Sequence, residues 1–136
     1  MNKAWILHIF FILLIGLTGC GNGEESTPQD PAAPPAPLTV EFQSSPEPAI
    51  VDQPVTLQVT VTQGSEKVSD ANDVQFEVWQ EGQEQHKMVP AENRGEGIYA
   101  LEVAFSETGK HYVMYHVTAR DMHSMSQREI DVQAAK

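Results

Sequence analysis

Hydrophobic and polar residues alternate through most of the chain beyond residue 37. The alternating segments are residues 38–42, 55–61, 74–78, 99–105, 113–117 and 130–132. A period of two residues is typical of strands that bury one face, and no segment carries the 3.6-residue stripe of an amphipathic helix. The pattern therefore predicts an all-β domain.

Turn-forming residues separate these segments, as in Gln63-Gly64-Ser65, Glu81-Gly82 and Thr108-Gly109. Short strands at this spacing, each with one apolar face, are typical of antiparallel sheets that pack face to face. We therefore expect residues 38–134 to form a small immunoglobulin-like antiparallel β-sandwich. The Cys pair of antibody domains is absent, because Cys20 is the only cysteine.

The chain begins with a segment that has the order of an export signal. One Lys near the start is followed by an apolar stretch that ends in Leu17-Thr18-Gly19-Cys20. This ending resembles the lipobox of bacterial lipoproteins, which implies cleavage after residue 19 and diacylation of Cys20. We expect residues 1–19 to be a lipoprotein signal peptide and the mature protein to be anchored by lipid on the extracytoplasmic face of the cell membrane. The alternative is an uncleaved anchor helix.

Residues 20–37 contain five prolines and no large apolar side chain. Such a segment cannot bury enough surface to offset the entropy lost on ordering, and proline keeps it partly extended. The composition predicts a disordered tether between the anchor and the domain.

The charge and the motifs narrow the classes of function. The formal net charge of −11 opposes binding to nucleic acid. The sequence contains no Gly-rich phosphate loop, no nucleophile motif and no zinc-binding helix, so we do not expect an enzyme.

The unusual chemistry of the chain lies in one short stretch. Beyond Cys20 the sequence has four His and four Met, and six of these eight residues lie within residues 111–125. Imidazole and thioether groups together suit Cu(I), and no thiol other than that of Cys20 is present. The alternative is that the Met residues fill gaps in packing and the His residues are solvated.

The alternation places these residues on an expected strand and turn. If Val113 and Val117 face the core, Met114 and His116 share the opposite face. A turn over residues 120–123 would then bring the following residues back above His116. His111 should face inward, so we do not include it among the candidate ligands. The candidate copper ligands are Met114, His116, Met122, His123 and Met125, with His86 and Met88 as a further pair that shares one face if it lies on a strand.

Several of these segments together resemble a known family. They are Val74-x-Phe-x-Val-Trp79, Gly95-x-Gly-Ile-Tyr-Ala100 and His116-Val-Thr-Ala-Arg-x-Met-His-x-Met125. In this order they resemble the YtkA-like, or FixH-like, domain of bacterial envelope proteins. The resemblance implies an immunoglobulin-like sandwich outside the membrane. For FixH-like relatives it also implies copper handling and a part in respiratory oxidase assembly, with an oxidase assembly factor as a partner.

Two functions remain open at this point. One is a membrane-anchored lipoprotein that binds Cu(I) through the His and Met residues. The other is an assembly module of the cell envelope that docks on another protein without metal, through a sheet edge or the aromatic-rich strand.

Overall fold

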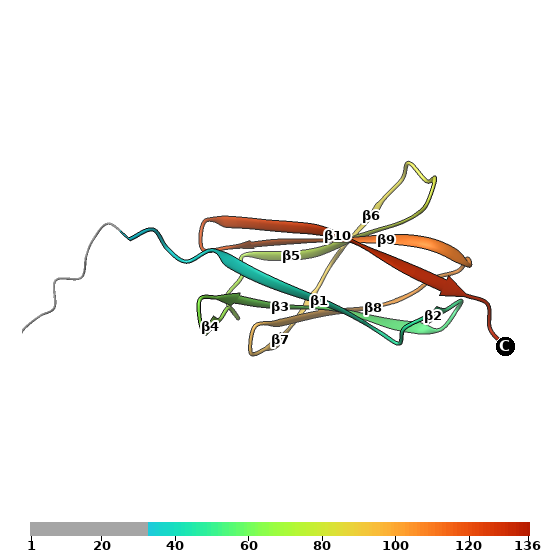
Figure 1. Ribbon diagram of the computed structural model, residues 1–136, viewed down its shortest axis with the longest axis horizontal. Helices are drawn as coiled ribbons and strands as arrows, with labels where there is room; N and C mark the ends of the chain where they lie inside the picture. Colours follow the sequence, from blue (N-terminus) through green and yellow to red (C-terminus); the bar gives the residue numbers. More distant parts are fainter. Residues whose placement is uncertain (1–32) are drawn as a thin grey trace, which may run out of the picture. The chain divides into compact units, whose positions relative to one another are not determined.

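The computed structural model describes residues 33–136, which form two β-sheets and no helix (Figure 1). In the first sheet the strands follow the order β1-β3-β8-β7, and β4 also pairs with β3. These strands are β1 (Leu38–Ser45), β3 (Pro54–Gln63), β4 (Glu66–Lys67), β7 (Glu92–Gly95) and β8 (Ile98–Ala104). No helix among the described residues is long and apolar enough to cross a membrane.

The second sheet carries the residues of interest, in the strand order β2-β10-β9-β5-β6. Its strands are β2 (Ala49–Ile50), β5 (Asp73–Gln80), β6 (Lys87–Pro90), β9 (Gly109–Ala119) and β10 (Met122–Gln133). The pairs are antiparallel except for the short parallel pair of β2 and β10. The all-β sandwich expected from the sequence is confirmed, with this one parallel pair as the departure from a purely antiparallel fold.

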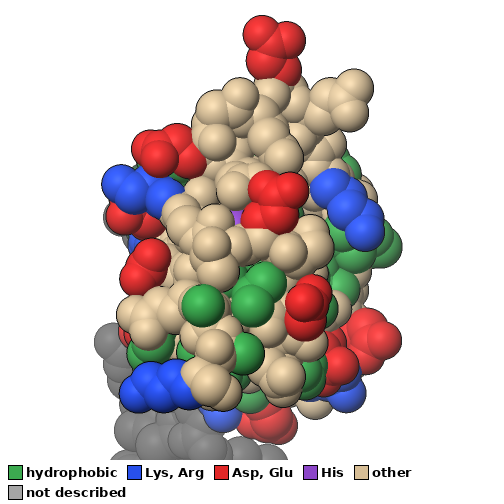
Figure 2. All heavy atoms as spheres, turned by 90° about the vertical axis from the view of Figure 1, so that its right-hand side faces the viewer, with side chains coloured by type: hydrophobic (Ala, Val, Ile, Leu, Met, Phe, Trp, Pro, Cys, Tyr) green, Lys and Arg blue, Asp and Glu red, His purple; other side chains and the backbone are tan. Residues whose placement is uncertain are grey.

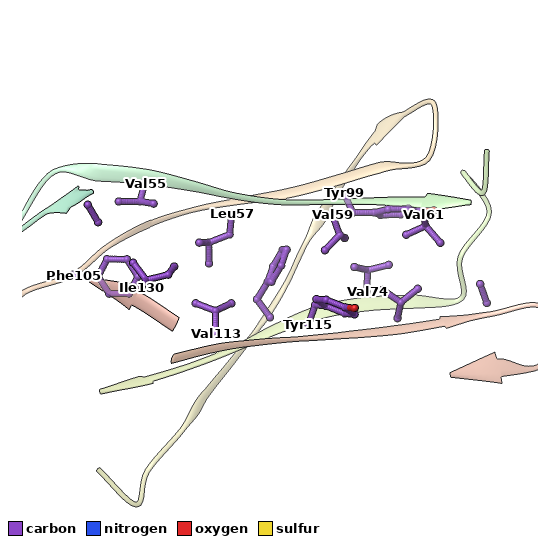
Figure 3. Packing of buried hydrophobic residues seen from close by; sticks show 14 of the residues in the cluster. Val55, Leu57, Val59, Val61, Val74, Tyr99, Phe105, Val113, Tyr115 and Ile130 are labelled. Atoms are coloured by element: carbon purple, nitrogen blue, oxygen red, sulfur yellow. The ribbon is translucent and has the colours of Figure 1, made fainter. Parts of the chain in front are cut away.

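The two sheets bury their alternating apolar side chains against each other (Figure 3). Val59 of β3 and Val113 and Val117 of β9 are fully buried, as is Phe76 of β5. Replacing a buried Phe by Ala typically costs about 3–5 kcal/mol, so this layer fixes which side of each strand faces in. The polar residues between them are thereby turned outward.

The predictions for the N-terminal part fall mainly outside the described residues. The signal peptide over residues 1–19, Cys20 and the first part of the tether all precede residue 33. Residues 33–37 are exposed and belong to no strand. The compact unit of the described residues spans Pro34–Lys136.

A two-residue turn joins β9 to β10. Arg120 and Asp121 both have positive φ angles, 52° and 62°, as required for the type I′ turn that matches the twist of paired strands. The expectation that the turn extends over residues 120–123 is wrong, because Met122 already pairs with Ala119 in the ladder. The register of the whole hairpin follows from this short turn.

Gly97 allows β8 to start close against β3. Its φ angle is +75°, and a Cβ atom there would lie 2.5 Å from the carbonyl oxygen of Val61. A left-handed conformation costs a residue with a Cβ atom roughly 1–2 kcal/mol. We expect Gly97→Ala to lower the free energy of unfolding by more than this, because the backbone at Val61 must also shift. Gly82→Ala is the matched control, since φ is +83° and no atom lies within 4 Å of the added Cβ. Equal losses for the two variants in denaturant unfolding would contradict this explanation.

Candidate metal-binding face

The outward side of the second sheet carries all but one of the predicted ligands. Along β9 the inward side chains are buried, while Met114, His116 and Thr118 alternate with them and are half-buried. We call the outward set the His/Met face. It consists of His86, Met88, Met114, His116, His123 and Met125.

The hairpin brings three of these residues together. In the antiparallel ladder Met125 lies directly opposite His116, and His123 lies opposite Thr118. Side chains of directly opposed residues stand on the same side of a sheet, about 4.5–5.5 Å apart at Cβ. The rings of His116 and His123 have their centroids 5.9 Å apart. Two imidazoles and one thioether therefore occupy neighbouring positions.

His86, which directly precedes β6, and Met88 of β6 reach the same face beside β5. Glu77 of β5 lies opposite Met88 on one side and opposite Met114 on the other. The three residues thus form one row across three strands. The sequence left open whether His86 and Met88 share a face with the hairpin, and the register shows that Met88 does. Among residues 33–136, Met88 and Met125 are the large apolar side chains that stay exposed, at 49% and 59%.

Glu77 links the two halves of the face. One carboxylate oxygen lies 2.5 Å from Nδ1 of His86, and the other lies 2.8 Å from Nε2 of His116. The carboxylate is only 19% exposed. The hydrogen bond from His86, followed by that from His116, holds the pKa of Glu77 below its ordinary value of 4.5. This carboxylate therefore stays ionised between two imidazoles.

Neighbouring side chains also orient the outer two His residues. Nδ1 of His123 lies 2.9 Å from the hydroxyl oxygen of Thr118. The ring of His86 stacks on that of Trp79 with centroids 4.1 Å apart and an angle of 8°. The ring centroid of Tyr112 lies 5.5 Å from that of Trp79. Trp79 is thus a half-buried packing residue on the outward side, and each His has a fixed neighbour.

Met122 does not belong to this face. It lies opposite Ala119, which is fully buried, so its side chain stands on the inward side of β10. The prediction that Met122 stands beside the other candidate ligands is wrong, because the turn ends at residue 121 and not at residue 123. His111 is inward as predicted, with 6% exposure, and packs against Phe105 at 4.7 Å between ring centroids.

The donor chemistry of the face is nitrogen and sulfur. Among residues 33–136 no three His, Cys, Asp or Glu side chains gather in a group that holds a metal ion by themselves. A metal bound at this face would therefore need thioether sulfur beside imidazole. Cu(I) is the first-row ion that such ligands suit best.

Arg120 fixes the tip of the hairpin, a role that the sequence did not reveal. Its guanidinium donates hydrogen bonds to Gln63, Glu66 and Asp70 at 2.8, 2.7 and 3.2 Å. Glu66, more than Asp70, raises the pKa of Arg120. Gln63 is the last residue of β3 and Glu66 belongs to β4, both in the other sheet, so this turn residue ties the two sheets together.

Comparisons with known proteins agree on the fold. A family model described as YtkA-like matches residues 32–116. No curated protein matches the chain. The crystal structure of an engineered protein is similar with a TM-score of 0.58 and 20% identity, over 74% of this chain and 21% of that one. An endo-β-1,4-mannanase from Thermotoga petrophila is similar with a TM-score of 0.53 and 15% identity, over 73% and 20%. The chain thus spans about a fifth of the length of these two structures, and the likeness concerns the fold alone.

The ionised state of Glu77 gives the face a pH-dependent contribution to stability. The pKa of Glu77 is lowered in the folded protein. The stability that its ionised carboxylate contributes is therefore present above pH 4.5 and is lost as the pH falls through the folded pKa. We expect wild type to be more stable than Glu77→Gln near neutral pH, with the difference shrinking below pH 4.5. Unfolding in denaturant at a series of pH values measures this. A difference that grows on acidification would contradict it.

Proposed function

The chain belongs to the YtkA-like family, and from this premise we propose that it is a Cu(I)-binding lipoprotein of the cell envelope. The observation that carries the proposal is the hairpin register, which sets Met125 opposite His116 with the ring of His123 5.9 Å from that of His116. The resemblance to FixH-like domains supports the same function, since copper handling is associated with those relatives. The ligands that bind Cu(I) in this proposal are His116, His123 and Met125, with Met114 beside them.

The chemistry of the face suits a carrier of copper outside the cytoplasm. Thioether and imidazole ligands are not consumed by disulfide formation, which removes thiolate ligands in oxidising compartments. Much of Met125 is open to solvent, so a partner protein has access to the ion. In this proposal the protein holds Cu(I) and transfers it to a second envelope protein, such as an oxidase assembly factor.

The anchor in this proposal is the lipid on Cys20. The lipobox-like segment Leu17-Thr18-Gly19-Cys20 supports it, and the proline-rich tether that follows gives the domain reach from the membrane surface. In this proposal the face then lies outside the membrane.

A second candidate function, docking without metal, is favoured by a cleft elsewhere in the domain. β8 pairs with β3 along its whole length, but β7 pairs with β8 only as far as Ala100. Within the described part of the chain, residues 101–104 of β8 therefore have a neighbouring strand on one side alone. Beside them is a cleft of about 450 Å³ whose apolar lining includes Val78, Leu101 and Phe105. Figure 2 views this end of the domain and shows hydrophobic side chains gathered between acidic ones. An extended segment of a partner could add to such an edge and place alternate side chains in the cleft.

Copper binding is tested by removing sulfur without changing the surface shape. Met→Leu keeps the apolar volume of the side chain but removes the thioether. We expect wild type to bind about one equivalent of Cu(I) in competition with a chromogenic chelator. We expect Met125→Leu alone to weaken Cu(I) binding, and Met125→Leu combined with His123→Ala to weaken it on the order of 100-fold or more, since one and then two ligands are lost.

The matched control is Met122→Leu, the same substitution on the same strand but on the inward side. It should leave Cu(I) affinity unchanged. The copper proposal would be contradicted if wild type competed with the chelator for Cu(I) no better than the Met125→Leu/His123→Ala variant. If wild type and Met125→Leu retain the same membrane proteins in a pull-down, with or without a chelator, the result would instead favour docking without metal.

A further inference from the structure

One carboxylate binds both imidazoles by different nitrogens. One carboxylate oxygen of Glu77 forms a hydrogen bond with Nε2 of His116, and the other forms one with Nδ1 of His86. An ionised carboxylate can only accept hydrogen bonds, so each contacting nitrogen of a neutral imidazole must carry the proton. The lone pair of His116 is therefore on Nδ1, and that of His86 is on Nε2. The two side chains are held in opposite tautomers.

We propose that Glu77 is a positioning residue that selects the metal-binding nitrogen of His116 and holds His86 in the opposite tautomer. The inference rests on the proposed function in so far as it concerns copper. The tautomers themselves exist in the metal-free protein. A carboxylate or carbonyl that fixes the second nitrogen of a ligating His is the usual partner in metal sites, and its loss typically lowers metal affinity about 10–100-fold.

The proposal is tested first without metal. The full-length protein in detergent, labelled with ¹⁵N in histidine, is examined at alkaline pH by long-range ¹H–¹⁵N correlation NMR, which distinguishes the two tautomers. We expect protonated Nε2 for His116 and protonated Nδ1 for His86. The latter is diagnostic, because imidazole free in water favours the proton on Nε2.

Substitution of Glu77 should change these tautomers in a defined way. In Glu77→Gln the amide offers one acceptor and one donor group, so one of the two imidazoles must change its tautomer. In Glu77→Ala, His86 should return to the tautomer preferred in water. Asp73→Asn is the control, because Asp73 lies on the same strand and face and its side chain bonds to Gln75. Its His tautomers should equal those of wild type.

The outcomes separate the two proposals. If His86 carries its proton on Nε2 in wild type, or keeps the wild-type tautomer in Glu77→Ala, the positioning role of Glu77 is wrong whether or not copper binds. If the tautomers are as expected, Glu77→Ala should lower Cu(I) affinity about 10–100-fold. An unchanged Cu(I) affinity would overturn the metal part. A wild type that binds no Cu(I) would reject the proposed function and leave the tautomer result standing.

Discussion

The register of the β9–β10 hairpin determines what the outward face of this domain presents. Successive side chains of a strand point to opposite sides, so a slip of one residue would exchange the two faces of β10. The turn at Arg120 and Asp121 has only two residues, both with positive φ, and this leaves a single pairing. In that pairing His123 and Met125 stand with His116, and Met122 turns inward. The chemistry of the face is therefore set by the geometry of a turn.

Two further constraints hold the hairpin in place. Its inward residues, such as Val113 and Val117, are fully buried against the other sheet, so a flipped β9 would expose them and bury His116 and Met114. At the tip, Arg120 donates hydrogen bonds to Gln63 at the end of β3 and to Glu66 of β4, and so ties the turn to the opposite sheet. Because these contacts are partly exposed, the buried core contributes more to stability than the ion pairs do. The ion pairs fix the position of the tip.

The strands and their inward faces could be predicted from the sequence because period-two alternation is a local property. It located β1, β3, β5, β8 and β9 and the outward direction of Met114 and His116. The end of the turn could not be read in this way, since Arg-Asp lacks the glycine that usually marks a type I′ turn. That single uncertainty misplaced Met122. The roles of Glu77 and Arg120 could not be predicted either, because the contacts of Glu77 with His116 and of Arg120 with Gln63 span 39 and 57 residues along the chain and depend on strand order.

Together these constraints give a small sandwich whose outward sheet face combines imidazole and thioether groups, with a carboxylate occupied between two imidazoles. The central claim is that this face binds Cu(I) through both sulfur and nitrogen. X-ray absorption at the copper edge of the Cu(I)-loaded protein tests it most directly. We expect a first shell that contains sulfur and nitrogen scatterers. A shell of nitrogen and oxygen alone would contradict it.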